Sequence, residues 1–267
     1  MKLDYCYHTH TSRCGHAYGK DEDFVLYAIK LGIKRLGFSD HVILPEGYSQ
    51  PGIRGDHSLY DDYIQSVKAL REKYKDQIDI IIGFEAEYYP QMEDYYRHLL
   101  DTDIEYLVLG QHCHLDEDGH SFVWYFDRDN RLERIIKYVD DVITGIKTGL
   151  FVYLAHPDLF MRYKDMWTPE IEYQSRRLLK ACEQYNFPIE INMTDFRNNV
   201  EGNFYKGYPN MNFFKVAKEY KLRYVIGIDA HQPKNFDQED LDKIEKGFID
   251  KLGIKIEDFV VERRHHD

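Results

Sequence analysis

Histidines and carboxylates recur in this sequence as pairs separated by one residue, an arrangement that can bind a metal ion. His8 and His10 stand in "LDYCYHTHTSRCGH" near the start of the chain, and Asp229 and His231 stand in "GIDAH" near its end. In an extended strand, residues i and i+2 point to the same face, so each pair can present two ligands to one ion. Imidazole combined with carboxylate favours Zn, Mn or Fe over Ca.

Two further pairs have the same spacing, and in each of them one member is the stronger candidate. Glu85 and Glu87 stand in "GFEAEY", and His112 and His114 stand in "GQHCH". We favour Glu85 and His112 as ligands. The roles of Glu87 and His114 remain open. Each could ligate a metal, orient a ligand or be a polar residue of the core.

The elements that would position these residues alternate between strands and helices. Seven β-rich runs are predicted at Leu3–Tyr7, Arg35–Phe38, Asp79–Phe84, Glu105–Leu109, Phe151–Leu154, Pro188–Ile191 and Arg223–Ile228. The amphipathic helices between them are predicted at Asp21–Leu31, Ser58–Tyr74, Gln91–Leu100, Leu132–Lys147, Pro169–Tyr185 and Asn212–Tyr220. Such alternation is typical of βα units and a parallel sheet. We expect one domain spanning residues 1–267.

Residues suited to binding metal or phosphate follow every one of these strand runs. In chain order they are His8 and His10, Asp40 and His41, Glu85 and Glu87, His112 and His114, His156 and Asp158, Asn192 and Arg197, and Asp229 and His231. The carboxyl ends of the strands in a parallel barrel converge at one mouth, where active sites are built. An open sheet could not easily bring all seven ends together, so the pattern favours a closed α/β barrel.

Three residues near the strand ends have two interpretations each. Asp40 either ligates a metal or holds a neighbouring imidazole, while Arg162 and Arg197 are either surface arginines or a clamp for phosphate. His16 follows a turn rather than a strand, and its spacing alone does not decide its role. Histidines in or beside helices, in a loop and at the terminus are set aside: His57, His98, His120, His265 and His266.

The composition narrows the class of protein. The 267 residues are 43% hydrophobic, which is enough for a sizeable core, and the formal net charge of −12 argues against a nucleic-acid binder. No stretch approaches the roughly 18 apolar residues of a membrane-spanning helix, so we expect no membrane partner. The four cysteines form no C-x-x-C pair, which argues against a structural thiolate zinc site and fits a reduced, cytoplasmic location.

The ordered set of H8-x-H10, His16, Asp40-His41, Glu85, His112, His156 and D229-x-H231 resembles the polymerase-and-histidinol-phosphatase (PHP) superfamily. The resemblance covers about residues 3 to 235. Within that superfamily, "GFSDH", "GFEAEY", "AHPDLFMR" and "EIN" followed by Arg197 are similar to the stand-alone histidinol-phosphatases. This resemblance implies a distorted (β/α)7 TIM-like barrel with a trinuclear metal centre at the C-terminal ends of the strands.

The resemblance also implies roles for individual residues. One ion would be held by His8, His10, Glu85 and Asp229, a second by Glu85, His112 and His156, and a third by His16, His41 and His231. Arg162 and Arg197 would bind the phosphate, and Asp229 or His231 would protonate the leaving group. The implied reaction is the hydrolysis of L-histidinol phosphate in histidine biosynthesis, with hydroxide formed from a metal-bound water whose pKa falls to about 7.

Two other functions remain open at this point. The first is a PHP-type phosphoesterase that acts on nucleotides or other phosphorylated metabolites, because nothing in the residue chemistry names histidinol. The second is a metal-binding barrel without catalytic activity, which the intact set of nine ligand positions disfavours, because a cluster of buried polar side chains is costly without a metal. The polar segment "MTDFRNNVEGNFYKGYP" (193–209) bears on this choice because we expect it to shape the pocket for the leaving group.

Overall fold

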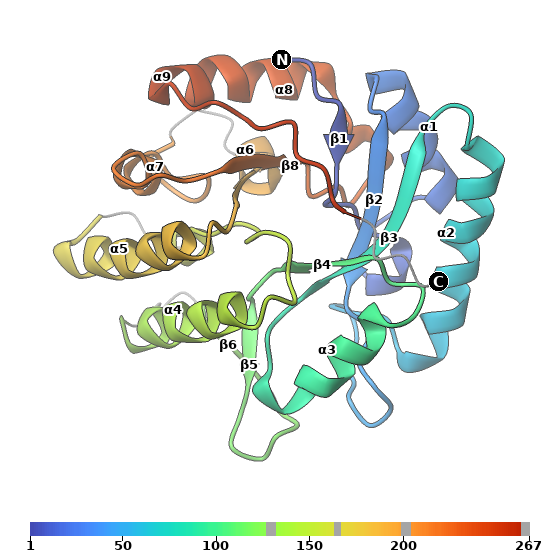
Figure 1. Ribbon diagram of the computed structural model, residues 1–267, viewed down its shortest axis with the longest axis horizontal. Helices are drawn as coiled ribbons and strands as arrows, with labels where there is room; N and C mark the ends of the chain where they lie inside the picture. Colours follow the sequence, from blue (N-terminus) through green and yellow to red (C-terminus); the bar gives the residue numbers. More distant parts are fainter. Residues whose placement is uncertain (127–131, 163–166, 199–203, 263–267) are drawn as a thin grey trace.

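The computed structural model describes residues 1–126, 132–162, 167–198 and 204–262, and it is an α/β fold with a curled parallel sheet (Figure 1). Four parallel strands lie side by side in the order β1 (Tyr5–Cys6), β2 (Arg35–His41), β3 (Asp79–Ala86) and β4 (Tyr106–Leu109). A second parallel pair consists of β7 (Ile189–Asn192) and β8 (Tyr224–Gly227). The helical crossovers between these strands are the reason why the pairing is parallel.

Single parallel β-bridges join these strands to one another beyond the two sheets. Leu109 pairs with Leu154, Leu154 pairs with Ile189, and Thr9 pairs with Ala230. The strand that we predicted at Phe151–Leu154 is therefore reduced to one bridging residue, Leu154. This residue still lies between β4 and β7, which is the place that the predicted strand would occupy. Because every link is parallel, the carboxyl ends of all these segments lie on the same side of the molecule.

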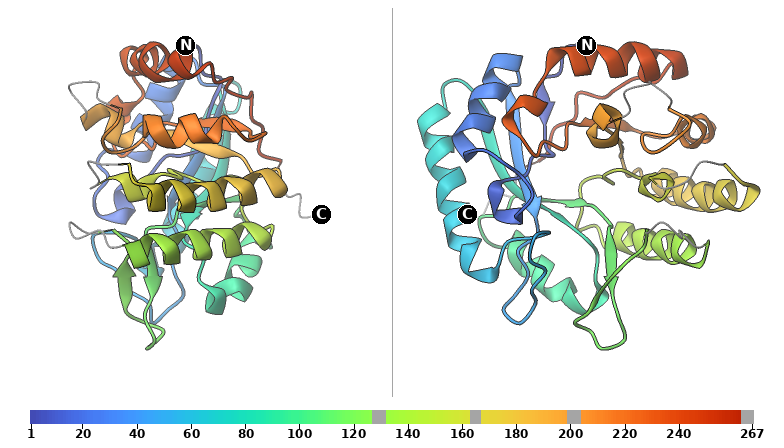
Figure 2. Two further views of the ribbon diagram at one scale, coloured as in Figure 1. Left: turned by 90° about the vertical axis from the view of Figure 1, so that its left-hand side faces the viewer. Right: turned by 180° about the vertical axis from the view of Figure 1, so that it is seen from behind.

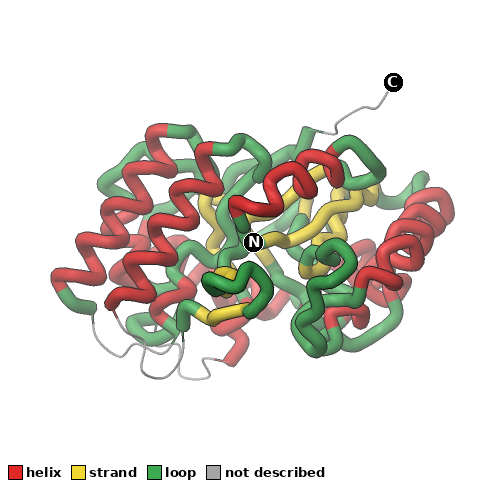
Figure 3. Tube along the Cα trace, turned by 90° about the horizontal axis from the view of Figure 1, so that it is seen from below, coloured by secondary structure: helices red, strands yellow, loops and turns green. Residues whose placement is uncertain are grey.

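The helices lie around the outside of the strands (Figures 2 and 3). The α-helices are α1 (Asp21–Leu31), α2 (Tyr60–Tyr74), α3 (Glu93–Leu100), α4 (Leu132–Lys147), α5 (Pro169–Gln184), α6 (Thr194–Asn198), α7 (Met211–Ala217), α8 (Gln238–Ile244) and α9 (Asp250–Leu252). The 3-10 turns are η1 (Ser12–Cys14), η2 (His57–Leu59), η3 (Pro90–Met92), η4 (Leu159–Met161) and η5 (Pro233–Asn235), and η6 (Glu245–Ile249) is a π-helical turn. Among the described residues, no helix is long and apolar enough to cross a membrane.

Local signals in the sequence fix several of these boundaries. Helix α1 is followed by the cap residue Gly32, whose φ of 90° is readily available to glycine. Helix α5 is preceded by the cap residue Thr168, whose side chain accepts a hydrogen bond from the Ile171 N–H. The structure also contains an antiparallel hairpin that we did not predict, formed by β5 (Cys113–Leu115) and β6 (Phe122–Trp124). Each of its strands has only three residues, which is too short for an alternating pattern to be recognised.

Tyr106 fills the interior between the strands. Its buried hydroxyl donates to the carbonyl oxygens of Tyr7 at 3.0 Å and Phe38 at 3.1 Å, and so it links three strand segments. Gly37 and Gly83 lie on the two neighbouring strands, and a Cβ at either position would overlap the Tyr106 ring. These glycines therefore provide the space that lets an aromatic residue occupy this part of the core.

The change Tyr106→Phe tests this packing, because it removes the hydroxyl and leaves the ring in place. We expect the free energy of unfolding of the metal-free protein to fall by about 1–3 kcal/mol, since two buried carbonyls lose a partner. Denaturant titration measures the change, and Tyr173→Phe, at a tyrosine that is 63% exposed, is the control. Equal losses in both variants would contradict this view of the core.

Candidate metal centre

All nine side chains predicted as metal ligands lie in one connected cluster at the carboxyl ends of the strands. They come from the segment after β1 (His8, His10), the turn after η1 (His16), β2 (His41), β3 (Glu85), the segment after β4 (His112), the segment after the Leu154 bridge (His156) and the segment after β8 (Asp229, His231). In each of them, a side-chain nitrogen or oxygen atom lies within 3.6 Å of a side-chain nitrogen or oxygen atom of another member. Residues separated by more than 200 positions are thereby brought into contact.

The Glu85 carboxylate is at the centre of this cluster. One oxygen, Oε1, lies 2.8 Å from His156 Nε2, 3.4 Å from His8 Nε2 and 3.6 Å from His112 Nε2. The other oxygen, Oε2, lies 3.3 Å from His41 Nδ1 and 3.5 Å from His10 Nε2. The two oxygens thus face different groups of imidazoles, which is the arrangement expected of a carboxylate that bridges two ions.

The position of Glu85 depends on its backbone neighbours. It is paired with His41 in the register between β2 and β3, so the two side chains leave the sheet on the same face. On the other side lies Gly110, where a Cβ would overlap the Glu85 carboxylate. A glycine at the end of β4 is therefore what leaves room for a carboxylate at the end of β3.

Asp229 is the second acidic member of the cluster. Its Oδ1 lies 3.1 Å from His10 Nε2, 3.2 Å from His231 Nδ1 and 3.5 Å from His8 Nε2. Its Oδ2 accepts hydrogen bonds from Thr194 Oγ1 at 2.6 Å and from Asn192 at 3.1 Å. One oxygen is therefore held by the protein while the other faces the histidines.

Two of the clustered residues have a backbone conformation that is uncommon for residues other than glycine. The φ angle is 28° at His156 and 50° at Asp229. Such backbone strain persists where the surroundings over-determine it, and it concentrates at functional sites. His156 lies two residues after the Leu154 bridge, and Asp229 lies two residues after the end of β8, so both stand where the chain leaves the sheet and turns.

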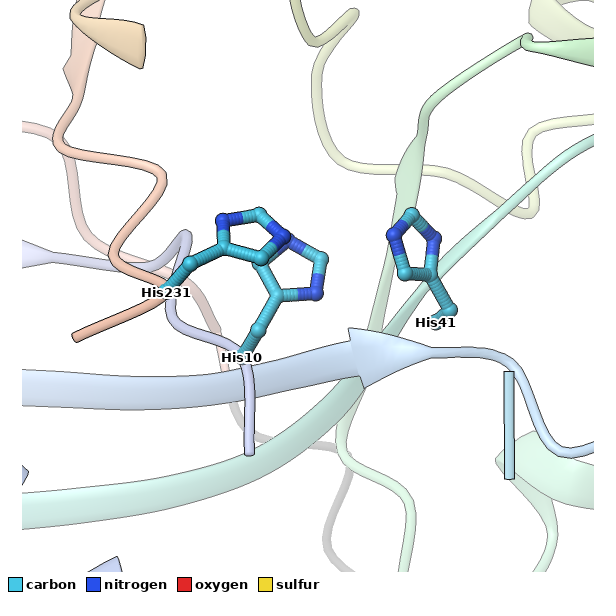
Figure 4. A group of neighbouring side chains, drawn as sticks. All are labelled: His10, His41 and His231. Carbon is cyan, nitrogen blue, oxygen red and sulfur yellow. The ribbon is translucent and has the colours of Figure 1, made fainter. Parts of the chain in front are cut away.

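The remaining histidines form the outer part of the cluster, where Figure 4 shows the ring of His231 stacked on that of His10, with His41 opposite them. The His10 and His231 ring centroids are 4.0 Å apart with an interplanar angle of 22°. His16 Nε2 lies 3.0 Å from His231 Nε2. Cys14, which we did not predict as part of the site, has its sulfur within 4.8 Å of ring nitrogens of His16 and His231.

The donor atoms of this cluster fit divalent metal ions. Several buried ones make no hydrogen bond within the described part of the chain: His8 Nε2, both ring nitrogens of His10, His41 Nδ1, His156 Nδ1 and Asp229 Oδ1. Buried polar atoms are almost always paired in folded proteins, because an unpaired one costs free energy. Imidazole nitrogens and carboxylate oxygens directed at one another are the donor set of Zn, Mn and Fe sites.

The electrostatics of the cluster also suit cation binding. Burial alone would raise the pKa values of the Glu85 and Asp229 carboxyls, but the surrounding histidines outweigh it and hold both pKa values well below their usual range. Burial, reinforced by neighbouring imidazoles, lowers the pKa of His41 strongly and that of His16 as well. The neighbouring carboxylates act in the opposite direction on His8, His10 and His112 and raise their pKa values against the effect of burial. The cluster therefore offers ionised carboxylates and neutral rings at His16 and His41, while a metal that binds at His8, His10 or His112 would displace a proton.

His112 and His114, between which the sequence did not decide, occupy different places. His112 Nε2 faces Glu85, whereas the ring of His114 lies in the hairpin, 5.2 Å from the ring of Tyr125 and with Nδ1 3.0 Å from the Leu115 carbonyl oxygen. Glu87, whose role the sequence also left open, accepts from His112 Nδ1 at 3.0 Å. Glu87 thus orients a proposed ligand.

Asp40, whose role the sequence left open, contacts neighbouring residues that carry or adjoin proposed ligands. It accepts a hydrogen bond from the Thr11 hydroxyl and another from the backbone N–H of His41 at 2.9 Å, while its Oδ1 lies 3.5 Å from His10 Nδ1. Of the histidines set aside, His57 lies 3.0 Å from the Leu44 carbonyl oxygen and the ring of His120 lies against Tyr48. His265 and His266 lie outside the described residues.

Two buried charged residues at the site were missed by the sequence analysis. Arg54 forms an ion pair of 2.9 Å with Glu87 and thereby supports the contact of Glu87 with His112. Glu190 on β7 accepts from His8 Nδ1 at 2.8 Å. Glu190 could have been found, because it stands two residues before Asn192 and so points to the same face of its strand. Arg54 lies in a loop with no such signal.

A cavity of about 330 Å³ opens beside the cluster. Eight of the nine proposed ligands line it, and the others that line it are Ile53, Trp124, Leu159, Arg162, Thr194 and Tyr208. Arg197 is not a lining residue, and its guanidinium donates to the carbonyl oxygens of Ile228 at 2.9 Å and Asp229 at 3.2 Å. The cavity therefore combines ligand-type residues and one arginine with an apolar wall.

Comparison with known proteins places the chain in a family. A family model described as "PHP domain" matches residues 7–194, which is more than half of the chain. This chain belongs to the PHP domain family. Among curated relatives, the histidinol-phosphatase of Bacillus subtilis is 26% identical over 253 residues, covering 84% of this chain and 92% of the relative. The probable histidinol-phosphatase of Deinococcus radiodurans is 26% identical over 239 residues, covering 85% of each chain.

Two solved structures of other proteins have a similar fold. The histidinol phosphate phosphatase of Lactococcus lactis, complexed with Zn, L-histidinol and phosphate, has a TM-score of 0.72 at 18% identity and covers 95% of each chain. The putative histidinol phosphatase of Listeria monocytogenes has a TM-score of 0.71 at 20% identity, covering 88% of this chain and 97% of that chain. At these identities, the structural likeness shows the shared fold.

The change Glu85→Gln tests whether the cluster binds metal. We expect the metal content per chain to fall to less than roughly half of the wild-type value, because a neutral amide replaces the anion that faces five imidazoles. Elemental analysis of the purified proteins measures the change. Glu239→Gln, at a glutamate whose side chain is 78% exposed, serves as the control. Wild-type metal content in Glu85→Gln would contradict the central position of this carboxylate.

Proposed function

We propose that this protein is a metal-dependent phosphate monoester hydrolase and that its substrate is L-histidinol phosphate, which it cleaves in histidine biosynthesis. The observation that carries the proposal is the cluster of nine ligand-type side chains around Glu85, beside a cavity that Arg162 also lines. The chain belongs to the PHP family, and relatives of it are named histidinol-phosphatase. Both findings support the same reaction.

The proposal includes three divalent ions of Zn, Mn or Fe. The first would be held by His8, His10, Glu85 and Asp229, the second by Glu85, His112 and His156, and the third by His16, His41 and His231. The two Glu85 oxygens face different imidazoles, which supports its role as a bridge. His8 lies beside Oε1 together with His112 and His156, whereas His10, assigned to the same ion as His8, lies beside Oε2. The 3.0 Å approach of His16 and His231 supports the third group.

We further propose that the chain is one domain, residues 1–267, with a closed and distorted (β/α)7 barrel. The parallel bridges Leu109–Leu154, Leu154–Ile189 and Thr9–Ala230 support closure, because they continue the hydrogen bonding from β4 through β7 and from β8 back to the segment after β1. A closed ring would also explain why ligands from both ends of the chain meet at one rim.

Bound divalent ions lower the pKa of coordinated water and offset negative charge on phosphate oxygens. Arg162 would contribute the fixed positive charge of the cavity wall and would orient the phosphate. Its position among the lining residues supports this role. Arg197 is proposed as a second phosphate arginine on the strength of family resemblance, and its guanidinium is bonded to the backbone carbonyls of Ile228 and Asp229.

The leaving alcohol needs a proton, and two clustered residues could deliver it. His231 is partly exposed at the cavity, with its Nδ1 3.2 Å from Asp229 Oδ1, so the pair can hold a proton between them. The apolar wall of Ile53, Trp124 and Leu159 would exclude water from the rest of the substrate. Exclusion of water strengthens the electrostatic interactions of the site with phosphate.

Phosphate release from L-histidinol phosphate tests the proposed reaction. We expect the metal-loaded protein to hydrolyse this compound with a higher kcat/KM than mononucleotides or sugar phosphates, to lose the activity on chelation and to regain it when Zn, Mn or Fe is restored. Inorganic phosphate release measures all three results. Faster turnover of a nucleotide would overturn the substrate, and activity that survives complete metal removal would overturn the mechanism.

The change Arg162→Ala tests the phosphate-binding role separately from metal binding. We expect kcat/KM to fall roughly 10- to 100-fold, since a hydrogen bond to a charged group contributes about 1.5–3 kcal/mol, while metal content stays at the wild-type level. Steady-state kinetics and elemental analysis measure the two quantities. Arg97→Ala, at an arginine on α3 whose side chain is 52% exposed, is the matched control. Loss of metal in Arg162→Ala would mean that its role is misassigned.

A further inference from the structure

Glu190 is a fully buried carboxylate whose two oxygens both have partners in the described structure. Oε1 lies 2.8 Å from His8 Nδ1. Oε2 accepts from the backbone N–H of His156 at 2.9 Å and from the side-chain amide of Asn192 at 2.7 Å. Glu190 therefore contacts two proposed metal ligands that come from opposite halves of the chain.

The contact with His8 determines which ring nitrogen faces the cluster. A carboxylate can only accept, so Nδ1 must carry the proton of this hydrogen bond. In the neutral ring, Nε2 is then left with its lone pair. His8 Nε2 is buried, makes no hydrogen bond within the described ranges, and lies 3.4 Å from Glu85 and 3.5 Å from Asp229. Glu190 thus selects the tautomer that directs a free lone pair at the two acidic ligands.

The contact with His156 acts on the backbone instead. His156 has a φ of 28°, which is rarely populated by residues with a side chain, and its N–H is held by Glu190 Oε2. Its Nε2 lies 2.8 Å from Glu85 Oε1. The hydrogen bond from the N–H therefore helps to fix the turn that brings this imidazole to the central carboxylate.

The neighbouring strand leaves space for Glu190 in particular. A Cβ at Gly227 on β8 would overlap the Glu190 carboxylate. In the same way, a Cβ at Gly110 would overlap the Glu85 carboxylate. Two buried carboxylates of this fold thus each rely on a glycine of an adjacent strand end, although Glu190 faces the protein side of the cluster and Glu85 faces the proposed ions.

We propose that Glu190 is a positioning residue that sets metal affinity by holding the tautomer of His8 and the backbone of His156. This inference rests on the proposed metal centre and adds to it a residue that is not itself a ligand. Carboxylates that accept from the distal nitrogen of a metal-binding histidine commonly change metal affinity 10- to 100-fold when they are removed.

The isosteric change Glu190→Gln tests the proposal in the full-length, metal-loaded protein. The amide has one oxygen, so it cannot accept both from His8 and from His156 and Asn192. Competition with a chelator for Zn measures affinity, and we expect a loss of roughly 10- to 100-fold for at least one bound ion. The matched control is Glu105→Gln, since Glu105 also accepts from a backbone N–H, that of Ile82 at 2.9 Å, but stands directly before β4, at the opposite end of that strand from the proposed ligand His112.

A second measurement needs no variant and covers the case in which Glu190→Gln fails to fold. Long-range proton–nitrogen NMR of the Zn-loaded wild-type protein reports which nitrogen of His8 is protonated, and we expect Nδ1. Protonation at Nε2 would overturn the proposal, as would wild-type Zn affinity in Glu190→Gln or an equal loss in Glu105→Gln. Both readouts concern metal binding, so a protein that binds Zn as described but releases no phosphate would refute only the proposed function.

Discussion

The Glu85 carboxylate is buried among five imidazoles, and the cost of removing such groups from water constrains everything around it. An ionised group moved into a protein interior loses several kcal/mol of solvation, which only close partners of opposite charge can restore. The neighbouring histidines provide part of that compensation, because they hold the pKa of Glu85 well below its usual value against the effect of burial. Yet several ring nitrogens nearby have no hydrogen bond among the described residues. Divalent cations would complete both the charge balance and the coordination of these atoms.

The parallel topology makes this concentration of polar groups possible. Each strand delivers its final residues to the same edge, so His41 and Glu85 become direct neighbours in the ladder while residues far apart in the chain, such as His10 and Asp229, approach to 3.1 Å. The interior below the cluster is by contrast aromatic, with Tyr106 tying neighbouring segments together. Stability and chemistry are thus separated along the strand direction, which allows the polar end to carry strain at His156 and Asp229.

The sequence predicted the parallel α/β fold and identified the side chains that the strands bring together at their carboxyl ends, because both depend on short-range rules; that these side chains bind metal stays a prediction. The i, i+2 spacing at His8 and His10 and the position of Glu85 at a strand end required no knowledge of distant contacts. The supporting residues were harder to predict: Arg54 reaches Glu87 from a loop, and Gly110 and Gly227 matter only through side chains on other strands. The hairpin containing Trp124 was missed because its strands are too short to show a period. Tertiary contacts of this kind leave no local pattern in the sequence.

Anomalous X-ray diffraction from crystals of the Zn-loaded protein locates bound ions and so decides whether Glu85 bridges two of them. We expect anomalous peaks about 2.0–2.2 Å from each of the two Glu85 carboxylate oxygens, with histidine nitrogens completing the coordination. A further peak is predicted between His16, His41 and His231. Crystals whose only zinc lies elsewhere on the molecule, with the Glu85 oxygens still bonded solely to protein atoms, would contradict this role of Glu85.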